Sequence, residues 1–334
     1  MPGISLLLTV PPDLPVFLEL AVELCRRQDP RHLVEGLVIP DQRTREFRAL
    51  FEQVRSRWPE LPLRLVEPGP IARGLRPWLR VGSVIHWLQL VAGVNAARGS
   101  HVLLHDVDLF VRERGLFTRL YERCRDEQLA CAGIARPSAD AEWQGAASCA
   151  HLVAVRDVLF AQSWLREQSP NALRPQLGQV PEGRFWFETS LLAQARCAPE
   201  RIGGPEPLEQ VHFEYVIGTY RKFQRTRGPY EDANFRLLLI RLFIEAFARL
   251  PWNYELPTLE ELARGLEDPR QRVFYGARAR QGYERFRAEL APLLSSAHGF
   301  VDERAATTLR TALQPFDAAF LASCASPHLQ RARA

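Results

Sequence analysis

Two aspartates spaced by one residue, Asp106 and Asp108, directly follow the apolar run His101–Leu104. A strand that ends in two carboxylates places hard oxygen donors where the backbone leaves the sheet. Such donors bind Mg²⁺ or Mn²⁺ and leave coordination positions open for phosphate oxygens and water. A divalent ion held there can neutralise the charge of a diphosphate leaving group. The spacing alone also fits a helix cap or a turn.

The elements that must position these aspartates follow from the hydrophobic pattern. Apolar runs predict strands at Ile4–Val10, Gly36–Ile39, Leu63–Val66 and His101–Leu104. Helical spacing predicts helices from Asp13 or Pro15, over Thr44–Trp58 and over Gly82–Ala97. Gly99 follows the last of these helices and suits a left-handed C-cap.

The alternation of strands and helices is typical of an α/β fold with a mostly parallel, doubly wound central sheet. In such sheets ligands bind beyond the carboxyl ends of the strands. The polar residues just after the predicted strands are therefore the first candidates for a site: Thr9, Asp41, Asp106 and Asp108.

The chain becomes less regular after Phe110. The sequence predicts a helix over Leu116–Arg125, a strand over His151–Val155 and a loop or lid over Ser169–Gly183. From Tyr230 the pattern is helical, with segments at Asn234–Leu250, about Pro269–Ser295 and Glu303–Ala322. Thr258 and Glu261 have the spacing of a capping box. We therefore expect a catalytic domain over residues 1–228 and a helical C-terminal region over residues 229–334, on the acceptor side or at an oligomer contact.

Composition indicates a soluble globular protein, with 46% apolar and 25% charged residues and a formal charge of +4. Lys222 is the only lysine, so arginine, which suits phosphate recognition, supplies the positive charge. The six cysteines form no C-x-x-C pair and predict reduced thiols and a cytoplasmic location. The first residues have no signal-peptide pattern. Val81–Ala97 contains His86, Gln89 and Asn95, which favours a buried helix over a membrane span.

The stretch from Leu88 to Asp108, LQLVAGVNAARGSHVLLHDVD, resembles the helix-to-D-x-D passage of GT-A glycosyltransferases. The resemblance covers about residues 4–225. It implies a Rossmann-like GT-A domain, a nucleotide-sugar donor and a Mn²⁺ or Mg²⁺ ion. Asp108 would bind the metal directly, and Asp106 would contact ribose or metal-bound water. Val91 stands where the commonest subgroup has an asparagine, so the match to that subgroup is not close.

The resemblance also implies roles for residues elsewhere in the chain. Thr9, Pro11 and Asp41 would bind the base and ribose, although strand-end turns explain them equally well. His212 would complete the metal site, and Arg221, Lys222 and Arg225 would clamp the diphosphate. A structural histidine and a solvated basic helix face are the alternative readings of these residues.

Two further segments match the family's motif order. Gln144-Gly145 lies in a small polar loop that would face donor and acceptor, or is an ordinary surface loop. Glu188 would be the catalytic base or would orient the acceptor; otherwise it is a helix N-terminal carboxylate. Trp186 and Phe187 next to it would pack in the core or stack on sugar.

The expected function is transfer of a hexose from an NDP-sugar, with UDP favoured, to a hydroxyl of a saccharide, lipid or small-molecule acceptor. The sequence predicts no nucleic-acid partner and no transmembrane segment. A peripheral membrane contact is one interpretation of the segment Asn234–Leu250, but a helix packed in the core is favoured. The alternatives are a non-catalytic GT-A-like binding module and a sugar nucleotidyltransferase, whose glycine-rich loop is missing after Val10. A haloacid-dehalogenase-like phosphatase is disfavoured, because its D-x-D follows the first strand.

Overall fold

The computed structural model describes residues 1–69, 82–129, 131–134, 150–154, 208–226, 230–267 and 279–325. The chain divides into two compact units, a first unit from Met1 to Gln210 and a second unit from Val211 to Ala334. Glu188 and the segments around Gln144 and Ser169–Gly183 lie outside the described residues.

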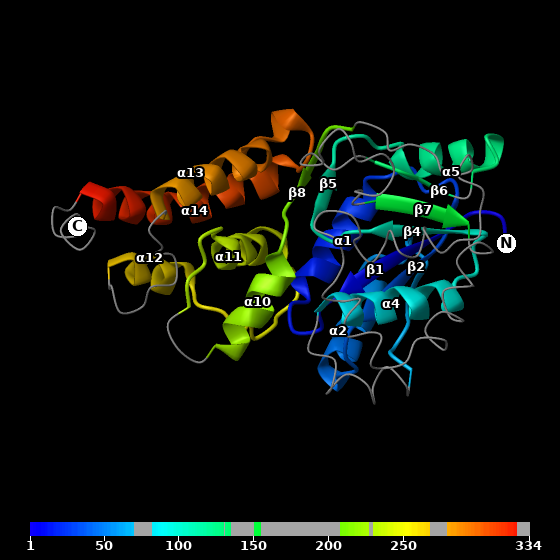
Figure 1. Cartoon of the computed structure of the whole chain (residues 1–334), viewed down its shortest axis with the longest axis horizontal. Helices are drawn as coiled ribbons and strands as arrows, with labels where there is room; N and C mark the ends of the chain where they lie inside the picture. Colours follow the sequence, from blue (N-terminus) through cyan, green and yellow to red (C-terminus); the bar gives the residue numbers. More distant parts are fainter. Residues whose placement is uncertain are drawn as a thin grey trace, which may run out of the picture. The chain divides into compact units, whose positions relative to one another are not determined.

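A six-stranded sheet forms the centre of the first unit, in the order β3-β2-β1-β4-β7-β6 (Figure 1). Its strands are β1 (Ile4–Val10), β2 (Leu33–Pro40), β3 (Leu63–Leu65), β4 (His101–His105), β6 (Cys131–Gly133) and β7 (Ala150–Ala154). The first four run parallel, whereas β7 runs antiparallel to both β4 and β6. The predicted mostly parallel α/β sheet is therefore confirmed.

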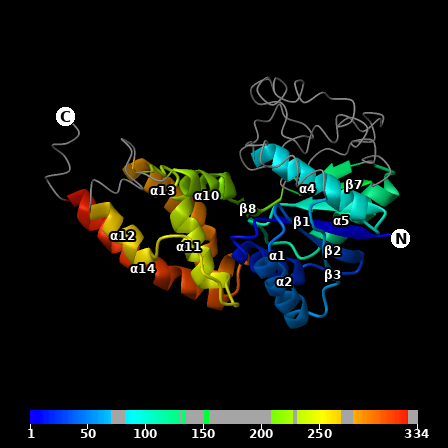
Figure 2. The same cartoon turned by 90° about the horizontal axis from the view of Figure 1, so that it is seen from below.

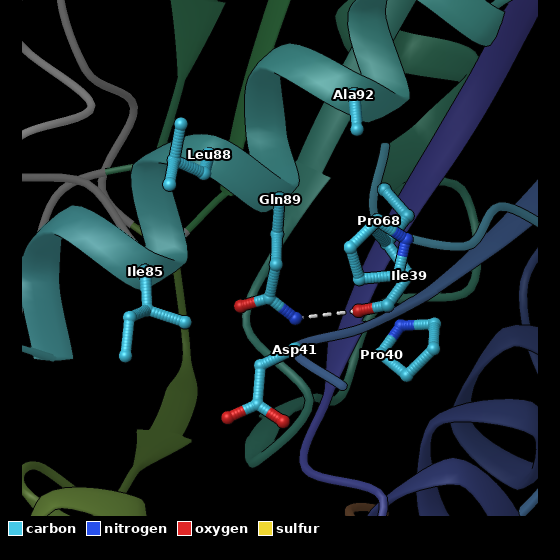
Figure 3. A pocket seen from close by; sticks show the side chains of 8 residues that line it. All are labelled: Ile39, Pro40, Asp41, Pro68, Ile85, Leu88, Gln89 and Ala92. Carbon is cyan, nitrogen blue, oxygen red and sulfur yellow. Dashed lines mark hydrogen bonds between the residues drawn. The ribbon is translucent and has the colours of Figure 1, made fainter. Parts of the chain in front are cut away.

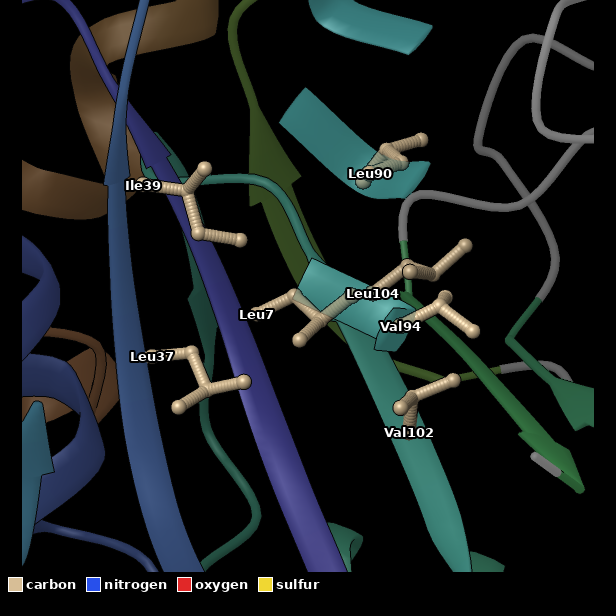
Figure 4. Packing of buried hydrophobic residues seen from close by; sticks show 7 residues of the cluster. All are labelled: Leu7, Leu37, Ile39, Leu90, Val94, Val102 and Leu104. Carbon is tan, nitrogen blue, oxygen red and sulfur yellow. The ribbon is translucent and has the colours of Figure 1, made fainter. Parts of the chain in front are cut away.

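Helices cover both faces of this sheet, which explains why β1 is buried along its whole length. In β1, Leu7 pairs with Leu37 of β2 and with Leu104 of β4, so one row of side chains crosses the sheet. The helix α4 (Gly82–Ala96) packs Leu90 and Val94 onto this row (Figure 4). The helices α1 (Val16–Arg26) and α2 (Arg45–Arg57) lie on the opposite face (Figure 2).

A short strand and a helix follow β4 in the first unit. The strand β5 (Leu109–Val111) comes just after the D-x-D residues, and the helix α5 (Leu116–Asp126) follows it. On α5, Phe117 makes an edge contact with His105 of β4, with ring centroids 5.8 Å apart. This contact packs α5 against the end of β4, next to Asp106.

Gly99 does not have the left-handed conformation that the sequence predicts. The positive-φ glycines among the described residues are Gly3 and Gly299. A side chain at position 99 would place its Cβ 2.7 Å from the carbonyl oxygen of Gly3 and 2.7 Å from the nitrogen of Ser5. Glycine is therefore required because the turn before β4 passes directly over the backbone of β1.

The second unit is built from helices around an aromatic core. After β8 (Gln210–His212) it contains α10 (Val216–Arg225), α11 (Arg236–Phe247), α12 (Leu259–Glu267), α13 (Ala279–Leu290) and α14 (Glu303–Ala325). Short 3-10 segments at Ala291–Leu294 and Ser296–His298 join the last two helices. The ring of Phe235 contacts those of Tyr283, Phe286, Phe316 and Phe320.

Two sequence predictions about these helices are confirmed. Thr258 and Glu261 form the reciprocal capping box, with N···O distances of 2.8 and 3.2 Å. The segment predicted over Asn234–Leu250 is a core helix, since α11 buries most of its side chains. Among the described residues, no helix has the length and apolar character needed to span a bilayer.

Candidate nucleotide-sugar site

The carboxyl ends of β1, β2 and β4 meet at one edge of the sheet, because these strands are parallel and adjacent. The chain leaves β1 through α1 on one face and enters β4 from α4 on the other. The sheet order therefore reverses between β1 and β4, and such a reversal opens a crevice beyond the strand ends. Asp106 and Asp108 follow β4 at this reversal, and Asp41 follows β2, on the other side of β1.

The D-x-D segment is a tight turn at the end of β4. The backbone N–H of Leu109 donates to the carbonyl oxygen of Asp106 over 3.2 Å. Val107 is buried between the two aspartates, Asp106 is half-buried, and Asp108 is 8% exposed. The turn and the buried Val107 restrict the backbone that carries both carboxylates.

A shallow pocket opens beside this edge of the sheet, with a volume of about 310 Å³ when the open solvent at its mouth is included. It lies between α4 and the ends of β2 and β3 (Figure 3). The residues that line it are Ile39, Pro40, Asp41, Pro68, Ile85, Leu88, Gln89 and Ala92. Among the described residues its lining is mostly apolar, with one carboxylate and one amide, which is the usual composition of a small-molecule pocket.

The pocket includes one of the three residues predicted to bind base and ribose. Asp41 lines it, and the side chain lies close to Gln89 in Figure 3. Thr9 is buried in β1, where it pairs with Ile39. Pro11 starts the turn before α1, with its carbonyl oxygen accepting from the N–H of Leu14 at 3.1 Å. Thr9 and Pro11 thus shape the strand end, and their contact with a ligand stays a prediction.

Gln89 is the polar lining residue that was not predicted from the sequence to belong to the site. Its amide nitrogen donates to the carbonyl oxygen of Ile39 over 2.6 Å and so ties α4 to the end of β2. The sequence does carry a signal, since Gln89 is a polar residue in the middle of an apolar helix. The partner, Ile39, lies fifty residues away and could not be inferred from that pattern.

The remaining predicted residues that are described belong to the second unit. His212 ends β8 and is half-buried. On α10, Arg221 donates to the side-chain oxygen of Gln224 over 3.1 Å, and the Lys222 ammonium lies 5.3 Å from the centroid of the Tyr230 ring. Arg225 donates to the carbonyl oxygen of Arg221 over 3.1 Å. Their predicted contacts with a diphosphate or a metal stay predictions.

The second group of predicted residues lies outside the part of the chain that the structure describes: Gln144, Gly145, Trp186, Phe187 and Glu188. Within the described part, no three His, Cys, Asp or Glu side chains form a group that could hold a metal ion. Asp106 and Asp108 therefore offer a pair of carboxylates at the strand end, and not a complete coordination shell.

No protein-family model and no curated protein matches the sequence. Among solved structures, the chain is similar to the mannosyltransferase PcManGT of Pyrobaculum calidifontis, determined with GDP-Man and Mn²⁺. That match has 15% identity and a TM-score of 0.44, and it covers 97% of this chain and 84% of the other. TarS of S. aureus matches at 11% identity and a TM-score of 0.40, over 96% of this chain and 90% of the other.

The glycosyltransferase GlyE of Streptococcus pneumoniae matches at 16% identity and a TM-score of 0.39, over 67% of this chain and 50% of the other. PcManGT and GlyE are named as members of the enzyme class that the sequence resembles. Because the TM-scores lie below 0.5, the function of this chain must be argued from its own residues.

Proposed function

We propose that the chain is a metal-dependent glycosyltransferase that moves a sugar from a nucleoside-diphosphate sugar to an acceptor hydroxyl. One observation carries the proposal: the Asp106–Asp108 turn and the Asp41 pocket lie at the same carboxyl edge of the first unit's sheet. A nucleoside-diphosphate sugar needs both features, an apolar pocket for the nucleoside and a cation for the diphosphate.

The donor set at the end of β4 fits a hard divalent cation. Carboxylate oxygens suit Mg²⁺ and Mn²⁺, which keep water and phosphate oxygens as their other ligands. Asp108 would bind the ion directly, and Asp106 would contact ribose or metal-bound water. When bound, the ion would offset the negative charge of the departing nucleoside diphosphate. The turn that fixes Asp106 and Asp108 would orient them before the donor arrives.

The sequence resemblance supports further roles within the proposal. His212 would complete the metal site, and Arg221 and Lys222 would bind the diphosphate. Glu188 would accept the proton of the acceptor hydroxyl or orient that hydroxyl. A uridine donor and a hexose are the family's expectation, whereas the acceptor would be a saccharide, a lipid or a small molecule.

Replacement of the metal ligand tests the proposal. In Asp108→Asn, Mn²⁺-dependent donor hydrolysis and sugar transfer should fall by about a hundredfold or more, because an amide holds the cation weakly. Asp126→Asn on the exposed end of α5 is the matched control and should keep full activity. Both proteins should unfold at the wild-type temperature.

Two results would count against the enzyme. If turnover is unchanged in Asp108→Asn, or continues after divalent ions are removed, the D-x-D turn does not bind a catalytic metal. Donor binding without hydrolysis or transfer to any saccharide, lipid or small-molecule panel would instead indicate a non-catalytic binding module.

A further inference from the structure

The pocket beside Asp41 has apolar side chains on two of its sides. Ile85, Leu88 and Ala92 from α4 lie on one side, and Pro40 at the end of β2 and Pro68 in the loop after β3 lie on the other (Figure 3). Apolar side chains on both sides stabilise a planar heterocycle by excluding water from its faces. A ribose, with hydroxyls pointing outward on several sides, would leave its polar groups unpaired against these walls.

The amide of Gln89 has a defined orientation in this pocket. A carbonyl oxygen cannot donate, so the amide nitrogen must be the atom that faces Ile39 O at 2.6 Å. The amide oxygen must then face the other way. Gln89 is 8% exposed, and this bond is the one that its side chain makes within the described residues. Gln89 therefore presents a hydrogen-bond acceptor, the amide oxygen.

Asp41 presents a second acceptor on the same side of the pocket. Figure 3 shows its carboxylate and the Gln89 amide oxygen both turned away from Ile39. A carboxylate has about four lone-pair directions, so it can receive a ligand's N–H in addition to bonds within the protein. The described polar lining thus offers two hydrogen-bond acceptors, one from each residue.

We propose that this pocket selects guanine, so that the donor is a guanosine-diphosphate sugar. This inference rests on the function proposed above and replaces the uridine donor favoured by the sequence. Guanine carries two adjacent donors, N1–H and the 2-amino group, on one edge. Uracil has a single N–H between two carbonyl oxygens, and one of those oxygens would face an acceptor. Adenine and cytosine place a ring-nitrogen acceptor beside their amino group.

Nucleotide titration of the full chain in the presence of Mn²⁺ tests the selection without altering the protein. GDP should bind at least about tenfold more tightly than UDP, the discrimination expected of a two-point base contact. Inosine diphosphate, which lacks only the 2-amino group of GDP, should bind about tenfold more weakly than GDP. 2′-Deoxy-GDP should bind within about threefold of GDP, since the acceptors contact the base.

A matched pair of variants tests the role of Gln89. Gln89→Leu should lower GDP affinity about tenfold more than it lowers UDP affinity, so that the preference for GDP is lost. Gln53→Leu on the exposed face of α2 is the control and should bind both nucleotides like the wild type. If Gln89→Leu unfolds at a lower temperature than the wild type, its affinities do not test the base contact. In that case the comparison of GDP with inosine diphosphate on the wild-type protein tests guanine selection.

The outcomes separate this inference from the proposed function. If UDP binds as tightly as GDP, guanine selection is wrong, but the proposed glycosyltransferase function is not contradicted. Equal binding of GDP and inosine diphosphate, with a large loss for 2′-deoxy-GDP, would show that the acceptors contact ribose and would also overturn it. Failure of every nucleoside diphosphate to bind with Mn²⁺ would remove the proposed function itself.

Discussion

Glu35 is a buried carboxylate that joins three parts of the first unit. It accepts from the Ser5 hydroxyl over 2.8 Å, from the backbone N–H of Arg98 over 2.7 Å and from Arg64 Nε over 3.0 Å. Burial by itself raises the pKa of Glu35, but these three donors together hold that pKa below its ordinary value. Ser5 and Glu35 pair near the amino ends of their strands, far from the D-x-D turn, so Glu35 stabilises the fold without touching the site.

We predict that Glu35→Gln lowers the free energy of unfolding at pH 7 by about 2 to 3 kcal/mol, because three donors then face a neutral, partly mismatched amide. A lowered pKa gives stability that is present above the unfolded pKa and is lost as the pH falls through the folded pKa. The difference between wild type and variant should therefore shrink in acid. Urea unfolding from pH 7 to pH 3 measures it.

The control for this substitution is Glu46→Gln on the exposed face of α2, which should change stability by less than about 0.5 kcal/mol. Nucleotide affinity should be unaltered in the folded Glu35→Gln protein. Equal stability of that variant and the wild type at pH 7 would contradict the role given to the three donors.

Single residues were predictable from the sequence where their role depends on position after a strand. Asp41, Asp106 and Asp108 were selected because a polar residue after a parallel strand lies at the site edge. Gln89 and Glu35 were not, because their roles depend on partners in other elements. Glu188 and His212 were selected from motif order alone.

At the scale of elements, the approach of α4 to the sheet decides the width of the pocket. Gly93 of α4 faces the sheet, and a Cβ there would lie 2.5 Å from Ile39 Cδ1 and 3.0 Å from both methyl groups of Leu7. Ile39 also lines the pocket and accepts the Gln89 bond. A displaced α4 would therefore disturb both the core and the pocket.

We predict that Gly93→Ala lowers the free energy of unfolding by up to about 2 kcal/mol, because overpacking against the methyl ends of Ile39 and Leu7 outweighs the gain of about 1 kcal/mol in helix propensity. Nucleotide affinity should fall as well, since α4 carries one pocket wall. Gly218→Ala on α10 is the matched control, because a Cβ there meets nothing within 4 Å. It should be neutral or stabilising by up to about 1 kcal/mol. Thermal unfolding and GDP titration of both variants provide the measurements. Equal unfolding temperatures and GDP affinities of the two variants would show that the contact between α4 and the sheet can accommodate an added methyl group.

Elements with local signals were predicted closely. The helix predicted over Thr44–Trp58 is α2, which ends one residue before the predicted end, and Thr44 is its N-cap, accepting from the N–H of Phe47 over 3.1 Å. The antiparallel direction of β7 and the strand β6 were not predicted. Pairing direction depends on the path of the chain between strands, which side-chain periodicity does not encode.

At the scale of the whole molecule, the chain consists of two compact units that divide after Gln210. The sequence predicts the boundary between the two domains after residue 228, where the helical pattern becomes continuous. The strand β8 and the helix α10 come before that point, yet most of their residues belong to the second unit. The alternation of strands and helices in the sequence does not reveal this boundary, because the pattern of a strand or helix is the same in either unit.

This division makes hydrogen exchange a test of where the donor binds. Saturating GDP with Mn²⁺, at about a hundredfold above Kd, should slow exchange up to about a hundredfold for amides whose opening breaks the site. We predict this protection at the ends of β1, β2 and β4 and along the half of α4 that carries Gln89. The core helices α11 and α14 of the second unit should exchange as they do without ligand.

The behaviour of α10 in the same experiment tests the predicted phosphate contacts of Arg221 and Lys222. If these side chains hold the diphosphate, α10 should gain protection with GDP and Mn²⁺ but not with guanosine, which has no phosphates. Asp108→Asn supplies the control, because weaker metal binding should reduce protection at every site together. Protection confined to the second unit would contradict a donor site on the sheet of the first unit, since binding stabilises the segments that it contacts.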